Sequence, residues 1–251
     1  MSASSAGSSS IRRVGHKGAA DLVEGNTIPS FERAVEIGVD MVEFDVLRLR
    51  DGAPGLPAER RSPLVIAHDW HDAASRPALT LGDALDAFTR PPLDRVEIDC
   101  DLKLRGREDE LVRALQEREL VDRAMVSTMY VESLERIASL EPRLRLGWTY
   151  PLVTRPWDRK PLAAPAVLTA LELMRRRFPA HARRRAPEIG ASAIWVFHRV
   201  ASPRLAEVAR DLGIELIAWT VDDAESVARL RDIGVTGIVS NDPRLLQQRS
   251  G

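Results

Sequence analysis

Cysteine is almost absent from this sequence, and large aromatic side chains and any excess of charge are scarce as well. Cys100 is the only cysteine among 251 residues, which excludes an internal disulfide framework and makes a reducing compartment the default. The 36 basic and 37 acidic side chains leave a formal net charge of −1, so any function that uses charge must be local. Aromatic residues make up 5% of the chain and do not alternate with basic ones, which argues against nucleic-acid binding.

Long hydrophobic runs are also missing. No stretch approaches the roughly 18 apolar residues of a membrane span. The first ten residues are mostly serine, alanine and glycine, without the basic segment and apolar run of a secretion signal. We therefore expect residues 1–10 to be a disordered tail and residues 11–251 to be one domain. We also expect a cytoplasmic protein with no stable membrane insertion.

Two kinds of hydrophobic pattern alternate along the rest of the chain. Strand patterns occur at 11–15, 42–48, 63–67, 96–104, 124–127, 144–148, 193–197, 214–220 and 236–240, and helical patterns at 31–37, 80–88, 109–119, 131–138, 166–178, 203–212 and 227–233. Counting the strands that alternate with helices gives eight units without a linker, which predicts a single-domain (β/α)₈ TIM barrel. An open doubly wound sheet would need a glycine-rich phosphate turn after its first strand, and Gly-His-Lys-Gly at 15–18 is not one.

Two acidic residues share one side of a strand that is otherwise apolar. Successive side chains alternate across a strand, so Glu43 and Asp45 face the same way within residues 42–48. A barrel strand is buried on both faces, and a buried carboxylate needs a compensating partner. A divalent metal ion is the simplest single partner for two close carboxylates. We therefore expect this pair to hold a metal.

Further polar residues follow the ends of neighbouring strand patterns. Active sites of TIM barrels lie at the C-terminal ends of the strands. Four neighbouring strand ends are therefore expected to bring two imidazoles, three carboxylates and an ammonium to one mouth. These groups are His16, Glu43 with Asp45, His68, and Asp101 with Lys103. Together they combine ligands for a hard cation with groups that transfer protons near neutral pH.

The order of these motifs resembles the glycerophosphodiester phosphodiesterases. The resemblance runs from about residue 14 to residue 243 and rests on His-Lys-Gly at 16–18, Asn-Thr at 26–27 before a helix with Phe31, residues 38–46, His-Asp at 68–69, Asp-Leu-Lys at 101–103, Trp-Thr-Val at 219–221 and Ser-Asn-Asp-Pro at 240–243. No single motif is specific, whereas a first-strand histidine, a Glu-x-Asp and a His-Asp in this order are specific in combination.

The resemblance implies metal-dependent hydrolysis of small phosphodiesters on a TIM barrel. It assigns His16 and His68 as general acid and base, and Glu43, Asp45 and Asp101 as ligands of one Mg²⁺ or Ca²⁺. Lys17 and Lys103 would contact the phosphate; the alternative for Lys103 is that it only neutralises the acidic residues of its own strand, Glu97, Asp99 and Asp101. Trp219 is expected either to pack in the barrel or to form a wall for the glycerol or acyl group. The attacking group would be water or a hydroxyl of the substrate's own glycerol.

Three departures from the family pattern leave the substrate open. Lys17 stands where the family usually has arginine, and Gly25 stands where it has an acidic residue, with Glu24 displaced by one position. About ten residues, 70–79, separate the His-Asp strand from the next helix, so the usual insertion is short or absent and the mouth is expected to be open. Lysophospholipase D or sphingomyelinase D activity on lipid head groups is therefore an alternative, as is a non-catalytic phosphate-binding barrel.

Two further sets of charged residues have ordinary interpretations. Glu97 and Asp99 share a face with Asp101 but lie deeper, and we expect them to be ion-paired core groups. The arginine-rich stretch 175–185 is expected to be a solvated outer surface, with an anionic-lipid contact as the alternative. The expected partner is a small phosphodiester or a lysophospholipid, and the sequence carries no information on oligomeric state.

Overall fold

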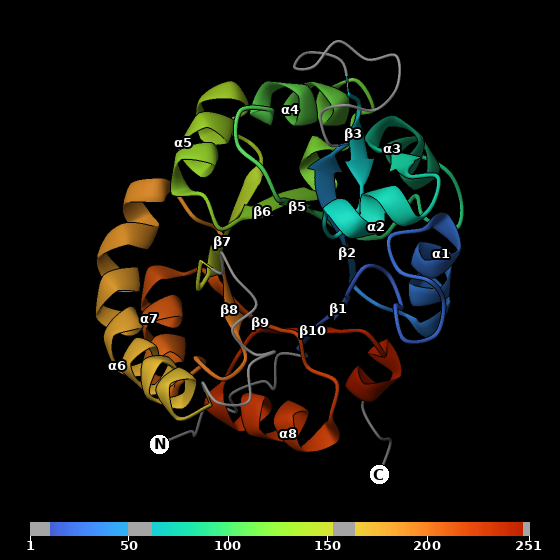
Figure 1. Ribbon diagram of the computed structural model, residues 1–251. Coiled ribbons are helices and arrows are strands. Elements are labelled where there is room, and N and C mark those ends of the chain that lie inside the picture. The colour runs from blue at the N-terminus through green and yellow to red at the C-terminus, as the bar shows by residue number, and fades with distance from the viewer. Residues whose placement is uncertain (1–10, 50–61, 153–163, 248–251) are drawn as a thin grey trace, which may run out of the picture.

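A closed barrel of eight parallel strands forms the centre of the protein (Figure 1). The computed structural model describes residues 11–49, 62–152 and 164–247, and the predicted tail at 1–10 lies outside them. The barrel strands are β1 (Arg12–Gly15), β2 (Met41–Arg48), β5 (Glu97–Leu102), β6 (Ala124–Thr128), β7 (Arg145–Tyr150), β8 (Ala193–Phe197), β9 (Glu215–Trp219) and β10 (Gly237–Ser240). Because β1 pairs in parallel with both β2 and β10, the sheet closes, and the predicted TIM barrel is confirmed.

Helices surround the barrel as an outer ring (Figure 1). They are α1 (Ile28–Ile37), α2 (Trp70–Ser75), α3 (Leu81–Phe88), α4 (Glu108–Gln116), α5 (Val131–Leu140), α6 (Ala164–Ile189), α7 (Pro203–Leu212) and α8 (Ala224–Ile233), with the 3₁₀ turns η1 (Val121–Arg123) and η4 (Pro243–Leu246). Local signals set their ends. In α1, the Thr27 side chain accepts from the backbone N–H of Ser30, and Gly38 ends the helix at φ 91°. None of the described helices has both the length and the apolar character needed to cross a bilayer.

The second predicted strand, at residues 63–67, is not a barrel strand. It forms β3 (Leu64–Ile66), which runs antiparallel to the end of β2 and pairs with the two-residue β4 (Leu79–Thr80). The neighbour of β2 inside the barrel is β5, in parallel register from Met41↔Glu97 to Val46↔Leu102. The prediction of four neighbouring barrel-strand ends is therefore corrected: β1, β2 and β5 supply three of them, and the antiparallel strand β3 supplies the fourth. Only α2 and β4 stand between this extension and α3, so the insertion is short, as predicted.

The alternation of β2 places its apolar and acidic residues on opposite sides of the barrel wall. Phe44 points outward and packs with Phe31 and Phe88, with ring centroids 5.3–5.6 Å apart and all three side chains fully buried. Glu43 and Asp45 therefore point inward. The outer helix layer thus fixes the strand that carries the predicted metal ligands.

Helix α6 is longer than its predicted range of 166–178. The helix continues through Pro179 and Pro187 to Ile189. Phe178, Ala182, Ala186 and Ile189 are buried at helical spacing, so this face packs against the rest of the core. The buried stripe outweighs the loss of a backbone hydrogen bond at proline.

The charged residues at the floor of the barrel behave in two ways. Glu97 accepts hydrogen bonds from Arg12 and from Arg145, so the predicted ion pairing is confirmed for this residue. Asp99 instead accepts from the Ser127 hydroxyl at 2.7 Å. Burial, followed by repulsion from Asp101, raises the pKa of Asp99 well above its usual value. The predicted ion pair is therefore wrong for Asp99, whose carboxyl group is hydrogen-bonded to a hydroxyl and forms no ion pair with the described residues.

Candidate metal and proton-transfer site

Three carboxylates from two adjacent strands meet inside the C-terminal mouth of the barrel. Asp45 on β2 and Asp101 on β5 are register partners, and Glu43 lies two residues before Asp45 on the same face. One oxygen from each of the three residues lies within 4.8 Å of the other two. Asp45 is fully buried, and Glu43 nearly so. The structure thus brings together the three residues that the sequence predicted as metal ligands.

Lys103 lies directly on this carboxylate cluster. Its Nζ is 2.7 Å from Asp45 Oδ1 and also donates to Asp101 Oδ2. This geometry matches the alternative in which Lys103 neutralises acids for Asp101, and it adds Asp45 of the neighbouring strand. A single ammonium against three carboxylates leaves an excess of negative charge in a buried place, which favours a further cation.

The pKa values of the three acids diverge because their surroundings differ. Burial, and then the charge of Asp45, raise the pKa of Glu43 well above its usual value. Burial also raises the pKa of Asp101. Burial alone would raise the pKa of Asp45 too, but Lys103 and the hydrogen bond from His68 lower it well below its usual value. Asp45 is therefore the ionised centre of the cluster.

Asn26 holds Asp45 in place from the loop before α1. Its side-chain Nδ2 donates to Asp45 Oδ2 at 2.9 Å, and its Oδ1 accepts from the backbone N–H of Asp45 at 3.2 Å. Asn26 adopts φ 58°, a left-handed conformation that asparagine tolerates better than most residues. The sequence contained a signal for this residue in the Asn-Thr pair before the helix, but its contact with Asp45 was not predicted.

His16 follows β1 and is held in one tautomer. Its Nδ1 is 2.6 Å from the side-chain Oδ1 of Asn241, which follows β10. A carbonyl oxygen only accepts, so Nδ1 carries the hydrogen and Nε2 keeps its lone pair. Nε2 lies 3.9 Å from Glu43 Oε2. Burial, and then the nearby charge of Lys17, lower the pKa of His16 to about 4, so this imidazole is neutral at pH 7.

Asn241 is itself fixed by Asp222. The carboxylate of Asp222 accepts from Asn241 Nδ2 at 2.7 Å and from its backbone N–H at 2.8 Å. This arrangement turns the amide so that its oxygen faces His16. Neither residue was predicted to have a role, because the contact joins loops after β9 and β10 to the loop after β1 and has no local pattern.

The low pKa of His16 gives a prediction for stability. The imidazole titrates at about 4 when folded and at about 6.5 when unfolded, so the unfolded chain binds more protons between these values. This contribution to stability is complete above pH 6.5 and is lost as the pH falls toward 4. Lowering the pH from 7 to 5 should therefore reduce the free energy of unfolding by about 2 kcal/mol. Urea unfolding of wild type and His16→Gln at both pH values, with chelator present, measures it. An equal loss in both proteins would contradict the neutral assignment.

His68 contacts the cluster at Asp45 and is more accessible than His16. It follows β3, and its Nδ1 lies 3.1 Å from Asp45 Oδ2. Its side chain is 51% exposed, whereas that of His16 is 18% exposed. Since the carboxylate of Asp45 accepts, Nδ1 of His68 donates, and Nε2 is left for another partner. The two predicted histidines therefore flank the three acids in different environments.

The backbone of Lys17 contributes more contacts to the site than its side chain does. Its N–H donates to Glu43 Oε2 at 2.9 Å, and its conformation is left-handed, at φ 51°. A Cβ at Gly25 would lie 3.0 Å from the Cβ of Lys17 and of Ala20, so glycine leaves room for this turn. Glu24 is 71% exposed and pairs with Arg76, away from the three carboxylates.

Trp219, the residue predicted either to pack in the barrel or to form a wall for the substrate, lies at the C-terminal end of a barrel strand. Trp219 ends β9 and packs on Phe197, with ring centroids 5.5 Å apart. Its buried Nε1 has no hydrogen-bond partner among the described residues. Trp148, in contrast, packs against Phe178 and His181 of α6, outside the barrel. Trp219 therefore stays a candidate for substrate contact.

Comparisons with known proteins give one consistent family. Residues 16–56 and 90–245 match the model of the glycerophosphoryl diester phosphodiesterase family. A glycerophosphodiester phosphodiesterase of Caldanaerobacter subterraneus is 25% identical, with 93% of this chain and 95% of the relative covered. His68 lies in the stretch that the family model leaves out, so its assignment depends on its contact with Asp45.

Solved structures share the barrel. The crystal structure of a glycerophosphodiester phosphodiesterase from Parabacteroides distasonis superimposes with a TM-score of 0.69 at 19% identity, covering 95% of this chain and 97% of that one. A phosphodiesterase from Oleispira antarctica, solved with its product sn-glycerol 3-phosphate, gives a TM-score of 0.65 at 17% identity, covering 94% and 96%. At these identities the likeness establishes the fold.

Proposed function

The chain belongs to the glycerophosphoryl diester phosphodiesterase family, and we propose that it hydrolyses glycerophosphodiesters to sn-glycerol 3-phosphate and an alcohol with the help of one divalent cation. The observation that carries this proposal is the buried cluster of three carboxylates with two histidines beside it, one near Glu43 and one hydrogen-bonded to Asp45. The product bound to the Oleispira antarctica phosphodiesterase supports the same substrate class.

The donor set suits Mg²⁺ or Ca²⁺. Carboxylate oxygens are the ligands that these hard cations prefer, and Glu43, Asp45 and Asp101 would supply them. A cation here would also relieve the raised pKa of Glu43 and satisfy Asp101 Oδ1, which is buried without a hydrogen-bond partner among the described residues. When bound, the cation would neutralise charge on the phosphoryl oxygens.

His16 suits the role of general base and His68 that of general acid. His16 is neutral with Nε2 free, so it can take the proton of the attacking water or glycerol hydroxyl. His68 donates from Nδ1 to the carboxylate of Asp45 at 3.1 Å, which orients its ring and leaves Nε2 for the substrate. It can therefore pass a proton from Nε2 to the oxygen of the departing alcohol. Lys17 would offer a positive charge to the phosphate, and Trp219 a surface for the glycerol.

A direct test measures release of glycerol 3-phosphate and choline from glycerophosphocholine, with and without chelator, beside lysophosphatidylcholine and sphingomyelin. We expect turnover of the small diester that stops on chelation and returns when Mg²⁺ or Ca²⁺ is added. Faster release of head group from either lipid would favour the lipid-cleaving alternative. Binding without turnover of any substrate would favour the non-catalytic barrel, and full turnover in chelator would contradict the metal assignment.

Lys103 should compete with the cation for the carboxylates. Lys103→Met removes the ammonium from Asp45 and Asp101 while keeping most of the side chain's volume. Because a charged hydrogen bond contributes about 1.5–3 kcal/mol, the affinity for Mg²⁺ should rise about tenfold or more. Calorimetric titration of Mg²⁺ measures this change. Lys17→Met is the matched control, since the Lys17 ammonium pairs with none of the three acids. Weaker binding to Lys103→Met would show that Lys103 supports the ion instead.

A further inference from the structure

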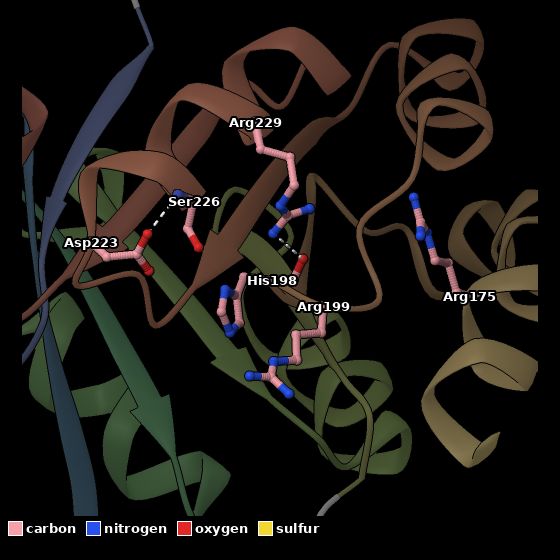
Figure 2. Close-up of a pocket in the computed structure, with 6 residues that line it drawn as sticks. All are labelled: Arg175, His198, Arg199, Asp223, Ser226 and Arg229. Carbon is pink, nitrogen blue, oxygen red and sulfur yellow. Dashed lines mark hydrogen bonds between the residues drawn. The ribbon is translucent and has the colours of Figure 1, made fainter. Parts of the chain in front are cut away.

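A second polar pocket lies between helices α6 and α8, and it shares no residue with the carboxylate site (Figure 2). It encloses about 340 Å³. His198 and Arg199 come from the loop after β8, Asp223 precedes α8, and α8 itself carries Ser226 and Arg229. Arg175 of α6 completes the lining. We call this set of six residues the arginine pocket.

Positive charge dominates the arginine pocket. It holds three guanidinium groups and one carboxylate. None of its arginines forms an ion pair with a carboxylate in the part of the chain that the structure describes. Elsewhere on α6, Arg176 pairs with Glu172 and Arg183 pairs with Asp211, whereas Arg177 and Arg184 form no ion pair with the described residues. The charges of the pocket are thus available to an outside partner.

The carboxylate of the pocket is already occupied, and some N–H donors of the pocket are free within the described ranges of the chain. Asp223 is occupied as the N-cap of α8, where it accepts from the backbone N–H of Ser226 at 2.7 Å. Arg229 donates from one nitrogen to the backbone carbonyl of His198 at 3.2 Å. Its remaining N–H groups do not take part in this hydrogen bond. His198 Nδ1 is buried and has no hydrogen-bond partner among the described residues. Figure 2 shows His198 beside Arg199 and Arg229.

We propose that the arginine pocket binds the phosphate group of a phosphomonoester, at a site separate from the carboxylate cluster. Guanidinium groups match phosphate oxygens through paired N–H donors. The imidazole of His198 adds one further donor, whereas the Ser226 hydroxyl already donates to Asp223. The chemistry is the same for a soluble phosphomonoester and for the head group of phosphatidic acid. Leu168 and Leu173 are exposed on α6, the helix that carries Arg175, and would suit the lipid source.

His198 offers a local reporter of binding. Burial, followed by the charges of Arg229 and Arg199, lowers its pKa. Asp223 and Asp222 oppose this effect. A phosphate between the arginines would add negative charge beside the imidazole and raise the pKa. An NMR titration of His198, assigned with His198→Gln, therefore distinguishes this pocket from phosphate bound at the carboxylate cluster.

The first experiment titrates inorganic phosphate and glycerol 3-phosphate into the full-length protein and follows His198. We expect saturable shifts and a raised pKa for His198. Binding should weaken about tenfold or more in Arg199→Ala and further in Arg175→Ala/Arg199→Ala. Arg177→Ala removes the same charge from α6 outside the pocket and should leave binding unchanged. An unmoved His198 signal, or equal binding in the double variant and wild type, would overturn the proposal.

The second experiment identifies the source of the phosphate. Sedimentation is compared for phosphatidylcholine vesicles with and without phosphatidic acid. Vesicle binding that requires phosphatidic acid and is lost in the double variant assigns the pocket to a lipid head group. If the protein binds phosphate in solution but does not bind these vesicles, the pocket is assigned to a soluble phosphomonoester. Neither experiment measures turnover, so failure here leaves the proposed diester hydrolysis standing.

Discussion

Replacing His16 by alanine is expected to lower kcat for glycerophosphodiester hydrolysis by about 10²–10⁴-fold, the range that general acid–base groups contribute. The structure gives two reasons: burial keeps the imidazole neutral, and Asn241 fixes its tautomer with Nε2 free. The change removes a proton acceptor and none of the three carboxylates. Affinity for Mg²⁺ should therefore stay within a few fold of wild type, as measured by titration calorimetry.

Two further variants make the His16 prediction specific. His71 lies on α2, is exposed, and contacts none of the three carboxylates, so His71→Ala should keep wild-type turnover. Asn241→Leu leaves the imidazole but removes its partner, and should lower kcat less than His16→Ala does. Combined with His16→Ala it should add little, because both changes affect one group. A kcat equal to that of wild type in His16→Ala would contradict the assignment of His16 as general base.

Phe88→Ala should lower the free energy of unfolding by about 3–5 kcal/mol, the usual cost of removing a buried phenylalanine. Phe88 is fully buried and packs on Phe44 and Phe31 at centroid distances of 5.5 and 5.3 Å. The cavity would open directly behind the strand segment that carries Glu43 and Asp45. We therefore expect the affinity for Mg²⁺ to fall together with stability.

Denaturant unfolding with chelator present measures this loss without the contribution of a bound ion. Phe88→Leu is the matched control, since leucine refills most of the space and should cost less than half as much. Phe197→Ala removes a partly buried ring near the mouth and should cost less than Phe88→Ala. A loss below about 1 kcal/mol for Phe88→Ala would mean that the three rings are not tightly packed.

The sequence was sufficient for the barrel and for the carboxylate cluster because both depend on local patterns. Alternation along residues 41–48 determines which side chains face inward, and strand order then places Asp101 beside Asp45. The capping residues Thr27 and Gly38 likewise mark the ends of α1 within a few positions of the chain. These features repeat at fixed spacings, so they can be read without tertiary contacts.

Contacts between distant loops were not predictable in the same way. Asn241 meets His16 across 225 positions of sequence, and no spacing rule connects them. The apolar run before His68 looked like a barrel strand because periodicity does not distinguish a parallel strand from an antiparallel one. Asp99 shares its sequence pattern with Glu97, yet arginines reach only Glu97.

Closure of the barrel by β1 and β10 has a consequence for the order in which the protein matures on the ribosome. The three acids lie on β2 and β5, whereas His16 receives its backbone contact from Ser240 and its tautomer from Asn241. A nascent chain whose last strand is still in the exit tunnel already contains all three carboxylates but lacks both contacts that orient His16. Synthesis of the final segment thus supplies the two contacts that orient His16 beside carboxylates that the nascent chain already contains.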